Sequence, residues 1–326
     1  MRDYEQEILE QYHIEADNIR KVRGAVLCET KEGVFLLRES RFSDERLSVL
    51  YELGEKLARA GYLVDQMILN KEGQYQTKIE DVGMFVLKKW FYARECDMRR
   101  EYELKEAVKH LAKLHGSMQM EPSEKFAMED LEEEYTRHNR ELKKVRSYIR
   151  GKVQKNEFEM AFLKYFEEMF AKADETLEYL KGSGYQKLRK ESLNKACVLH
   201  GDYNYHNILM VGQEMAVVNM EHFRQGIQIE DLYYFLRKAM EKYHWDARLG
   251  DGMIQAYQSV KSISKEEMAY LAIRLSYPEK FWKVANSYYR SNKVRIPAKG
   301  MEKLQREIAQ TKEKRDFLHN IFAFHL

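Results

Sequence analysis

Short apolar runs alternate with polar turns over the first 90 residues. Each run is bounded by Gly, Asn, Asp or Lys-Glu pairs, which is typical of strands joined by tight turns. Two of these turns share the same chemistry, at residues 30–33 (TKEG) and 70–73 (NKEG). The runs themselves are 19–30, 34–39, 63–69, 75–79 and 84–87. This pattern predicts five strands in a mostly antiparallel sheet.

One segment between these strands has helical periodicity instead. Ser43 precedes apolar residues that recur three and four positions apart, including Leu47, Leu50 and Leu57, and Gly61 follows them. Ser before and Gly after such a pattern predict the two ends of a helix. The first 90 residues are therefore expected to form a small α+β lobe.

After Trp90 the periodicity becomes helical. The segments with this pattern are 101–115, two long helices within 124–181, 229–245, the region after 253, and 301–322. The sequence thus predicts an α+β fold: a sheet lobe (1–90), a hinge (91–98) and a larger, mainly helical lobe (99–326).

Composition excludes several classes of protein. The chain is 44% hydrophobic and 33% charged, with 55 basic against 53 acidic residues, so it is expected to be globular and to have no overall field for nucleic acid. No apolar stretch is long enough for a membrane span, and residues 1–7 are charged with no apolar core following, which predicts no secretory signal. Cys28, Cys96 and Cys197 show neither pairing nor metal spacing and are expected to be free thiols in a reducing compartment.

The strongest chemical signal is the loop at residues 200–207 (HGDYNYHN), which lies between the apolar runs 196–199 and 208–211. Asp202 and Asn207 are five positions apart. In phosphoryl transfer an Asp and an Asn at this spacing act as the catalytic base and a Mg²⁺ ligand. The alternative is a polar turn in which both side chains bond the backbone.

In this loop and in the order of its elements, the chain resembles the aminoglycoside/choline kinase group of the protein-kinase-like superfamily, whose loop reads His-Gly-Asp-x-x-x-x-Asn. Within that group it is most similar to CotS-type spore coat proteins. The narrower resemblance rests on four segments: 30–38 (TKEGVFLLR), 90–95 (WFYARE), 111–115 (LAKLH) and 313–317 (EKRDF). It covers nearly the whole chain and implies a two-lobed kinase-like fold.

The resemblance also implies roles for single residues. Asp202 falls on the catalytic base and Asn207 on a metal ligand, while His200 matches a residue that braces the loop. Asp231 matches a structural Asp that anchors the loop. Arg38 falls on the phosphate-contacting lysine.

Two of these positions depart from the family pattern. Asn219 stands where a metal-binding Asp is expected, and Arg38 is larger than the lysine it replaces and is no compact point charge. Glu221, two positions after Asn219 on a predicted strand, is a candidate substitute metal ligand.

The remaining candidates belong to the nucleotide-binding set. Trp90 stands at the start of the link to the second lobe, and Glu52 or Glu55 is expected to supply the carboxylate that pairs with Arg38.

Two functions are consistent with these residues. The first is a CotS-type coat protein with a kinase fold impaired in catalysis (a pseudokinase), which acts by assembly with other coat proteins. The second is an active ATP- and Mg²⁺-dependent phosphotransferase for a small-molecule hydroxyl or amine. A protein kinase is disfavoured because the loop begins His-Gly-Asp and not His-Arg-Asp. The resemblance implies ATP and Mg²⁺ as cofactors, whose binding the two departures would weaken, and a cytoplasmic (mother-cell) protein that is incorporated into the coat, with neither nucleic acid nor membrane as partner.

Overall fold

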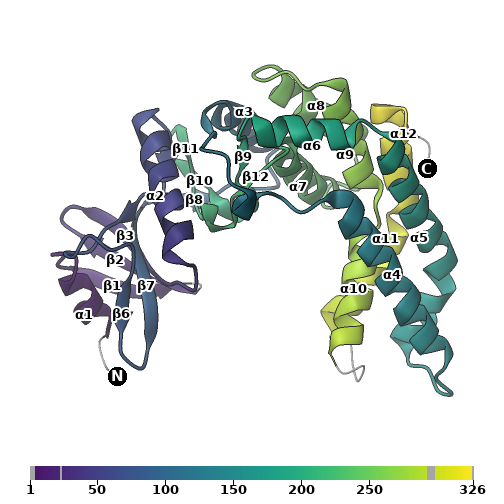
Figure 1. Ribbon diagram of the computed structural model, residues 1–326, viewed down its shortest axis with the longest axis horizontal. Coiled ribbons are helices and arrows are strands. Elements are labelled where there is room, and N and C mark those ends of the chain that lie inside the picture. The colour runs from purple at the N-terminus through teal and green to yellow at the C-terminus, as the bar shows by residue number, and fades with distance from the viewer. Residues whose placement is uncertain (1–3, 23, 292–297, 325–326) are drawn as a thin grey trace. The chain divides into compact units, whose positions relative to one another are not determined.

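The structure is a computed structural model that describes residues 4–22, 24–291 and 298–324 (Figure 1). Contacts divide the chain into two compact units. The first comprises residues 1–121 and 196–224, and the second comprises 122–195 and 225–326. The described residues form an α+β fold with a sheet-rich N-terminal region, as predicted.

The main sheet of the first unit is antiparallel and follows the order β1-β2-β3-β7-β5, with β6 also paired to β7. Its strands are β1 (Asn18–Val22), β2 (Ala25–Thr30), β3 (Gly33–Glu39), β5 (Met67–Ile68), β6 (Thr77–Ile79) and β7 (Gly83–Trp90). Helix α1 (Tyr4–Glu10) contributes Ile8 and Leu9 to the core that Phe35, Leu37 and Leu87 form on one face of this sheet.

Side chains of turn residues explain both hairpin signals. Thr30 Oγ1 accepts a hydrogen bond from the Glu32 amide (3.1 Å) and donates one to the Gly33 carbonyl (3.0 Å). Asn70 Oδ1 accepts from the amides of Glu72 (3.0 Å) and Gln74 (2.9 Å). These local bonds reverse the chain, as their residue types predict.

Two of the five predicted strands are each divided in the structure. The run 19–30 turns at Gly24, which has φ +70°, and becomes β1 and β2. The run 63–69 becomes β4 (Leu63–Val64) and β5, which join different sheets. The break falls at Asp65, a polar residue that interrupts the apolar run. Its buried side chain binds Lys88.

The first unit also contains a second sheet, of order β4-β11-β10-β8. Strands β10 (Ile208–Val211) and β11 (Glu214–Val217) form a hairpin, β8 (Arg94–Glu95) pairs with β10, and β11 is parallel to β4. The segment that begins at residue 196 is thereby tied to the N-terminal part, although residues 122–195 of the other unit come between them in the sequence. The predicted division into a sheet lobe (1–90), a hinge (91–98) and a helical lobe (99–326) stays a prediction.

Helices α2 (Asp44–Arg59) and α3 (Glu101–Ser117) also belong to the first unit, as do β9 (Val198–Leu199) and the 3₁₀ turns 205–207 and 220–222. Ser43 caps α2 by accepting from the Arg46 amide, as expected of Ser before a helical pattern. Gly61 has φ +87° just beyond the end of α2. The prediction of this helix is confirmed.

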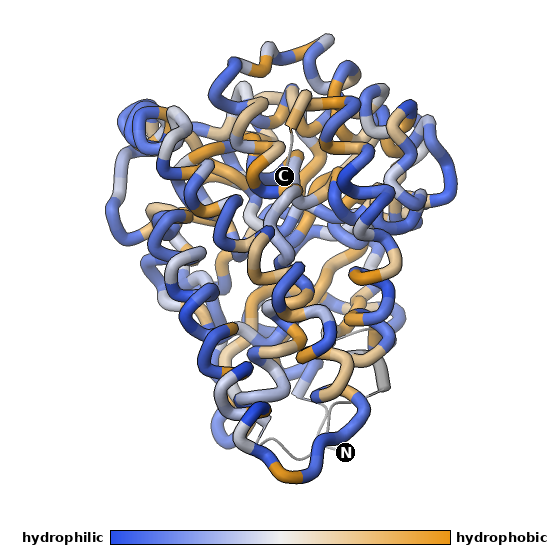
Figure 2. Tube along the Cα trace, turned by 90° about the vertical axis from the view of Figure 1, so that its right-hand side faces the viewer, coloured by the Kyte–Doolittle hydropathy of each residue, from blue (hydrophilic) through white to orange (hydrophobic). Residues whose placement is uncertain are grey.

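The second unit is helical. Its helices are α4 (Leu131–Arg150), α5 (Glu157–Gly182), α6 (Tyr185–Asn194), α7 (Ile229–Met240), α8 (Ala247–Gln258), α9 (Lys265–Ser276), α10 (Glu279–Arg290), α11 (Ala298–Ala309) and α12 (Thr311–Phe322). It also contains the 3₁₀ turn 124–126, and β12 (Arg224–Gln225) spans the boundary of the two units. Helix α4 packs against both α5 and α10. Along helices in Figure 2, hydrophilic and hydrophobic residues recur within each turn, as expected of amphipathic helices.

The predicted pair of long helices within 124–181 is confirmed as α4 and α5. Their junction carries a capping box, in which Asn156 and Glu159 exchange side chain-to-backbone bonds. The single helix expected over 301–322 is wrong in one respect: it is interrupted at the buried Gln310, whose side chain bonds Trp245 and the Glu241 carbonyl. No helix among the described residues is long and apolar enough to cross a membrane.

Candidate active site

A cavity of about 650 Å³ lies within the first unit, between the main sheet and the 202–222 region. Leu27, Leu36 and Trp90 give it an apolar part, and the hinge residues 91–93 border it. Its polar part holds most of the residues predicted from the sequence: Arg38, Asp202, Asn207, Asn219 and Glu221.

His200 fixes the loop that carries Asp202. The imidazole is buried; its Nε2 donates to the Val218 carbonyl (3.0 Å), and its Nδ1 accepts from the Asp202 amide (3.2 Å). The ring therefore joins the two segments that face the cavity. Its two partners require the neutral tautomer with hydrogen on Nε2.

Gly201 allows this loop to pass close to the 3₁₀ turn 220–222. Its φ is +79°, and a Cβ at this position would lie 2.0 Å from the carbonyl oxygen of His222. No other residue type fits such an approach without displacing the backbone. The glycine of the HGD motif is thus required by sterics.

The Asp202 carboxylate accepts two amide hydrogen bonds. Asn204 Nδ2 donates to Oδ1 (2.8 Å) and Asn207 Nδ2 donates to Oδ2 (3.0 Å). Each carboxylate oxygen has a further lone pair, so the group can still accept a proton from a hydroxyl in the cavity. The two amides hold it in place.

Asn207, Asn219 and Arg38 form a continuous chain of side-chain hydrogen bonds. Asn219 Nδ2 donates to Asn207 Oδ1 (2.8 Å), and Arg38 Nη1 donates to Asn219 Oδ1 (2.8 Å). Asn219 is in the left-handed region (φ 64°, ψ 50°), which Asn tolerates better than most residues. The two amide oxygens that the sequence assigns to a metal each already accept one N–H hydrogen bond, and the donor to Asn219 Oδ1 is the positively charged guanidinium of Arg38.

Lys88 is a central residue that the sequence did not single out. Its ammonium is only 4% exposed and lies 2.7 Å from Asp65 Oδ2 and 2.6 Å from Glu221 Oε1. Arg38 Nη1 is 4.0 Å from the same Glu221 oxygen, and the Asn219 amide donates to Asp65 Oδ2 (3.0 Å). A buried ion cluster thus lies directly behind the amide chain.

The pKa values of the two carboxyls in this cluster shift in opposite directions. Burial favours the neutral form of each group, but Lys88 and then Arg38 outweigh it at Glu221 and lower the pKa of that carboxyl to about 2. Burial, with repulsion from Glu221, raises the pKa of Asp65 despite Lys88. The two carboxylates together raise the pKa of Lys88 although burial opposes them, so the lysine stays charged.

Helix α2 contributes Arg46 to this region. Its Nε donates to the Glu221 carbonyl (2.7 Å) and its Nη2 to the Phe223 carbonyl (2.6 Å), with the guanidinium 4.4 Å from the Phe223 ring centroid. Among the described residues, neither Glu52 nor Glu55 forms an ion pair with Arg38. Glu52 is exposed, and Glu55 accepts from Gln66 and pairs with Arg59.

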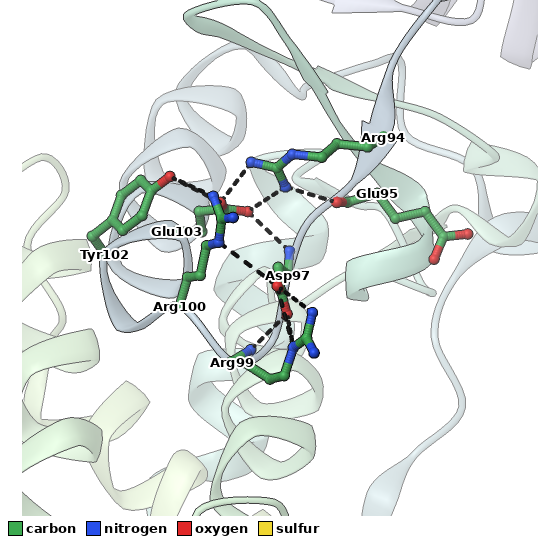
Figure 3. A network of polar contacts seen from close by, with 7 residues as sticks. All are labelled: Arg94, Glu95, Asp97, Arg99, Arg100, Tyr102 and Glu103. Carbon is green, nitrogen blue, oxygen red and sulfur yellow. Dashed lines mark hydrogen bonds and ion pairs between the residues drawn. The ribbon is translucent and has the colours of Figure 1, made fainter.

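The hinge and the start of α3 are held by a network of arginines around Glu103 (Figure 3). Arg94 binds the Glu103 carboxylate through both terminal nitrogens (2.9 and 2.7 Å), and the Asp97 amide and Tyr102 hydroxyl also donate to it. The Glu103 side chain is fully buried. The neighbouring Glu95 contacts His206 Nδ1 (2.6 Å), so the network extends to a residue that lines the cavity.

Glu103→Gln is expected to destabilise the protein by about 2 kcal/mol at pH 7, because charge-assisted bonds to a buried carboxylate are lost. Arg94 above all lowers the pKa of Glu103 to about 2. This contribution is therefore complete above pH ~4.5 and disappears as the pH falls toward 2. Urea unfolding at pH 7 and pH 3 measures the difference, which should shrink at the lower pH.

Glu106→Gln is the matched control, since Glu106 is an exposed residue of the same helix with one surface partner, Lys109. Equal losses in the two variants would show that the Glu103 network does not stabilise the fold.

As arranged, the donor set does not fit Mg²⁺. This hard cation prefers carboxylate and free oxygen ligands. Asn207 Oδ1 and Asn219 Oδ1 already accept hydrogen bonds, and the Glu221 carboxylate is bound to Lys88. Of the two predicted acidic residues that line the cavity, Asp202 and Glu221, only Asp202 has no cationic partner among the described residues.

Asp231, the last predicted site residue, is buried on α7 of the second unit. Its role as an anchor of the loop stays a prediction. Of the three cysteines, all free, Cys28 and Cys96 are buried and Cys197 is partly exposed.

Known proteins match the chain over nearly its full length. The profile of the family described as "Spore coat putative kinase YutH" matches residues 5–321. Spore coat protein S of Bacillus subtilis (strain 168) is 22% identical over 335 residues, which span 97% of this chain and 93% of the relative. The predicted resemblance to spore coat proteins is confirmed.

Solved kinases share the fold. An aminoglycoside phosphotransferase from Alicyclobacillus acidocaldarius superposes with a TM-score of 0.87 at 15% identity, over 98% of this chain and 95% of that one. An amicoumacin kinase, solved with AMP-PNP, Ca²⁺ and Ami, gives a TM-score of 0.62 at 12% identity over 96% and 93%. These likenesses confirm the predicted kinase-like fold class.

Proposed function

Because this chain belongs to the spore coat YutH family, we propose that it is a coat component that acts by binding or assembly and is impaired in phosphoryl transfer. One observation carries the proposal: the two amide oxygens of Asn219 and Asn207 that would have to bind a divalent ion bring no negative charge, and the guanidinium of Arg38 already donates to Asn219 Oδ1. The proposal places the protein in the spore coat, with other coat proteins as partners.

Magnitudes support impairment. Loss of one preorganised electrostatic group costs about 10²–10³ in rate. Two independent losses, at positions 38 and 219, would multiply to about 10⁴–10⁶, although such effects are seldom independent. From an ordinary kinase turnover of about 1–100 s⁻¹, this leaves at most about 10⁻² s⁻¹. A binding component needs no faster chemistry.

The test is a turnover measurement. Pure protein with radiolabelled ATP, Mg²⁺ and a panel of alcohols, amines and sugars is expected to transfer less than about one phosphoryl group per minute. Asp202→Ala measures the background, because it removes the carboxylate that would take the acceptor proton. Faster transfer that disappears in Asp202→Ala would refute impairment.

The second candidate is an active phosphotransferase that uses Glu221 as a metal ligand. The supporting observation is that Glu221 is ionised and lines the same cavity as Asp202 and Asn207. It predicts stabilisation by ATP that requires Mg²⁺ and is lost in Glu221→Gln, with circular dichroism to verify folding. ATP binding that is the same with Mg²⁺ and with a chelator would contradict this candidate.

A further inference from the structure

Three potential ligands meet in the second unit, between helices α4 and α10. Glu134 and His138 are four residues apart on α4 and so lie on one face of it, and Glu279 is the first residue of α10. Each offers one ligand atom, and the three atoms lie within 4.8 Å of one another. Glu134 Oε1 and His138 Nε2 are 3.9 Å apart, too far for a hydrogen bond.

Burial leaves two of these side chains with unmet bonding capacity. His138 is 2% exposed and Glu279 is 7% exposed. Among the described residues, neither His138 Nδ1 nor Glu279 Oε2 has a hydrogen-bond partner. Lys283 pairs with the other oxygen, Oε1 (2.9 Å), so Oε2 is the open ligand atom of Glu279. Buried polar atoms without partners are rare and costly, which points to a missing ligand.

The two carboxylates lie close together among cations that do not bridge them in the described part of the chain. Lys283 pairs with Glu279 Oε1 (2.9 Å) and leaves Oε2 open. Arg274 is instead held by the Glu230 carboxylate (2.6 and 2.9 Å). Two carboxylates are thus held close together in a largely buried place. A positive charge between them would relieve both their repulsion and their desolvation.

The imidazole of His138 is held in place by its neighbours. Trp282 stacks on it with ring centroids 3.3 Å apart, and the indole is held in turn by its bond to Glu141 Oε2 (2.8 Å). The ring is therefore fixed in orientation.

We propose that Glu134, His138 and Glu279 form a site for one divalent transition-metal ion, Zn²⁺ above all, which links α4 to α10. One nitrogen and two carboxylate oxygens are a Zn²⁺ donor set, and three ligands are too few for Ca²⁺. Tetrahedral Zn²⁺ requires ligand atoms about 3.4 Å apart. The three ligand atoms lie within 4.8 Å of one another, so no pair must approach by more than about 1.4 Å, and the Glu134 side chain is partly exposed and can rotate. Its exposure also provides the route of entry and room for a water as fourth ligand.

The experiment uses the full-length chain after treatment with a chelator and its removal. Equilibrium dialysis against Zn²⁺ alone, with metal content by mass spectrometry, counts the bound ions, and Co²⁺ in place of Zn²⁺ reports the coordination by visible absorption. In Glu134→Gln and in Glu279→Gln, the affinity of this site for Zn²⁺ is expected to fall at least about 100-fold. At micromolar Zn²⁺ each variant should therefore bind one ion fewer per chain than the original protein. Both should also lose the Co²⁺ band.

Glu133→Gln is the matched control, because Glu133 is the exposed neighbour on the same turn and its replacement changes the charge equally. It should keep both the ion and the band. Folding of each variant is verified by circular dichroism before dialysis, and Glu134, being partly exposed, is the variant least at risk. Equal ion counts in all four proteins, or no ion retained by the original chain at micromolar Zn²⁺, would overturn the proposal.

Discussion

Replacing Lys88 with methionine is expected to lower the free energy of unfolding by about 3–5 kcal/mol. The substitution keeps most of the unbranched side chain but removes the charge that lies between Asp65 and Glu221. Two buried carboxylates would then face each other, and Arg38, the remaining ion-pair partner of Glu221 among the described residues, is 4.0 Å away. Urea denaturation at pH 7 measures the loss.

Lys89→Met provides the control, since Lys89 is the next residue on β7 and is exposed. It should change the stability by no more than about 0.5 kcal/mol. The pH dependence distinguishes charge from packing. Without Lys88 the folded-state pKa values of both carboxyls rise. Protonation of these carboxyls then stabilises the folded variant, so the difference in free energy of unfolding between the variant and the original protein should become smaller as the pH falls toward 4. If this difference does not change with pH, the loss of stability comes from packing alone.

The sequence predicted most of the local elements because their signals are local. Ser43 at the start of α2, the TKEG and NKEG turns, and the apolar spacing of α3 each act within a few residues. Where the prediction failed, a long-range contact decided the structure. The break between β4 and β5 lies at Asp65, whose side chain accepts a hydrogen bond from Lys88, 23 residues away. The break at Gln310 accompanies its hydrogen bonds with Glu241 and Trp245.

The same distinction applies to the site. Asp202, Asn207, Asn219 and Arg38 were found because a motif and a resemblance mark their positions, and the structure brings them to one cavity. Lys88 and Arg46 carry no motif. A lysine within an apolar strand, beside a second lysine that must face the opposite way, was the available signal for Lys88. The acidic residue next to Arg38 could not be predicted from the sequence. Helix α2 has several glutamates, and nothing in their spacing shows that Glu221, far away in the sequence, lies closer to Arg38 than they do.

The largest gain of function is expected from Arg38→Lys and Asn219→Asp combined. The backbone at 219 tolerates the change, since Asp also adopts the left-handed region. An aspartate at this position has no side-chain N–H, so Asn207 Oδ1 would lose its donor and two oxygens would face one another. That pair, with a negative charge, is what Mg²⁺ requires. ATP binding should become dependent on Mg²⁺, and turnover should rise by at least about 10² if a suitable acceptor is present.

The single variants show why both changes are needed. In Asn219→Asp alone, Arg38 would form an ion pair with the new carboxylate at the present 2.8 Å and occupy it in place of the metal. In Arg38→Lys alone, Asn219 Nδ2 still donates its hydrogen bond to Asn207 Oδ1, and no negative charge is added for the metal. The effects should therefore be strongly non-additive, with most of the gain in the double variant and all turnover lost when Asp202→Asn is added. Titration calorimetry with ATP, with and without Mg²⁺, and the radiolabel assay measure both. If the folded double variant binds ATP without regard to Mg²⁺, the amide and the guanidinium are not what separates this cleft from an active one.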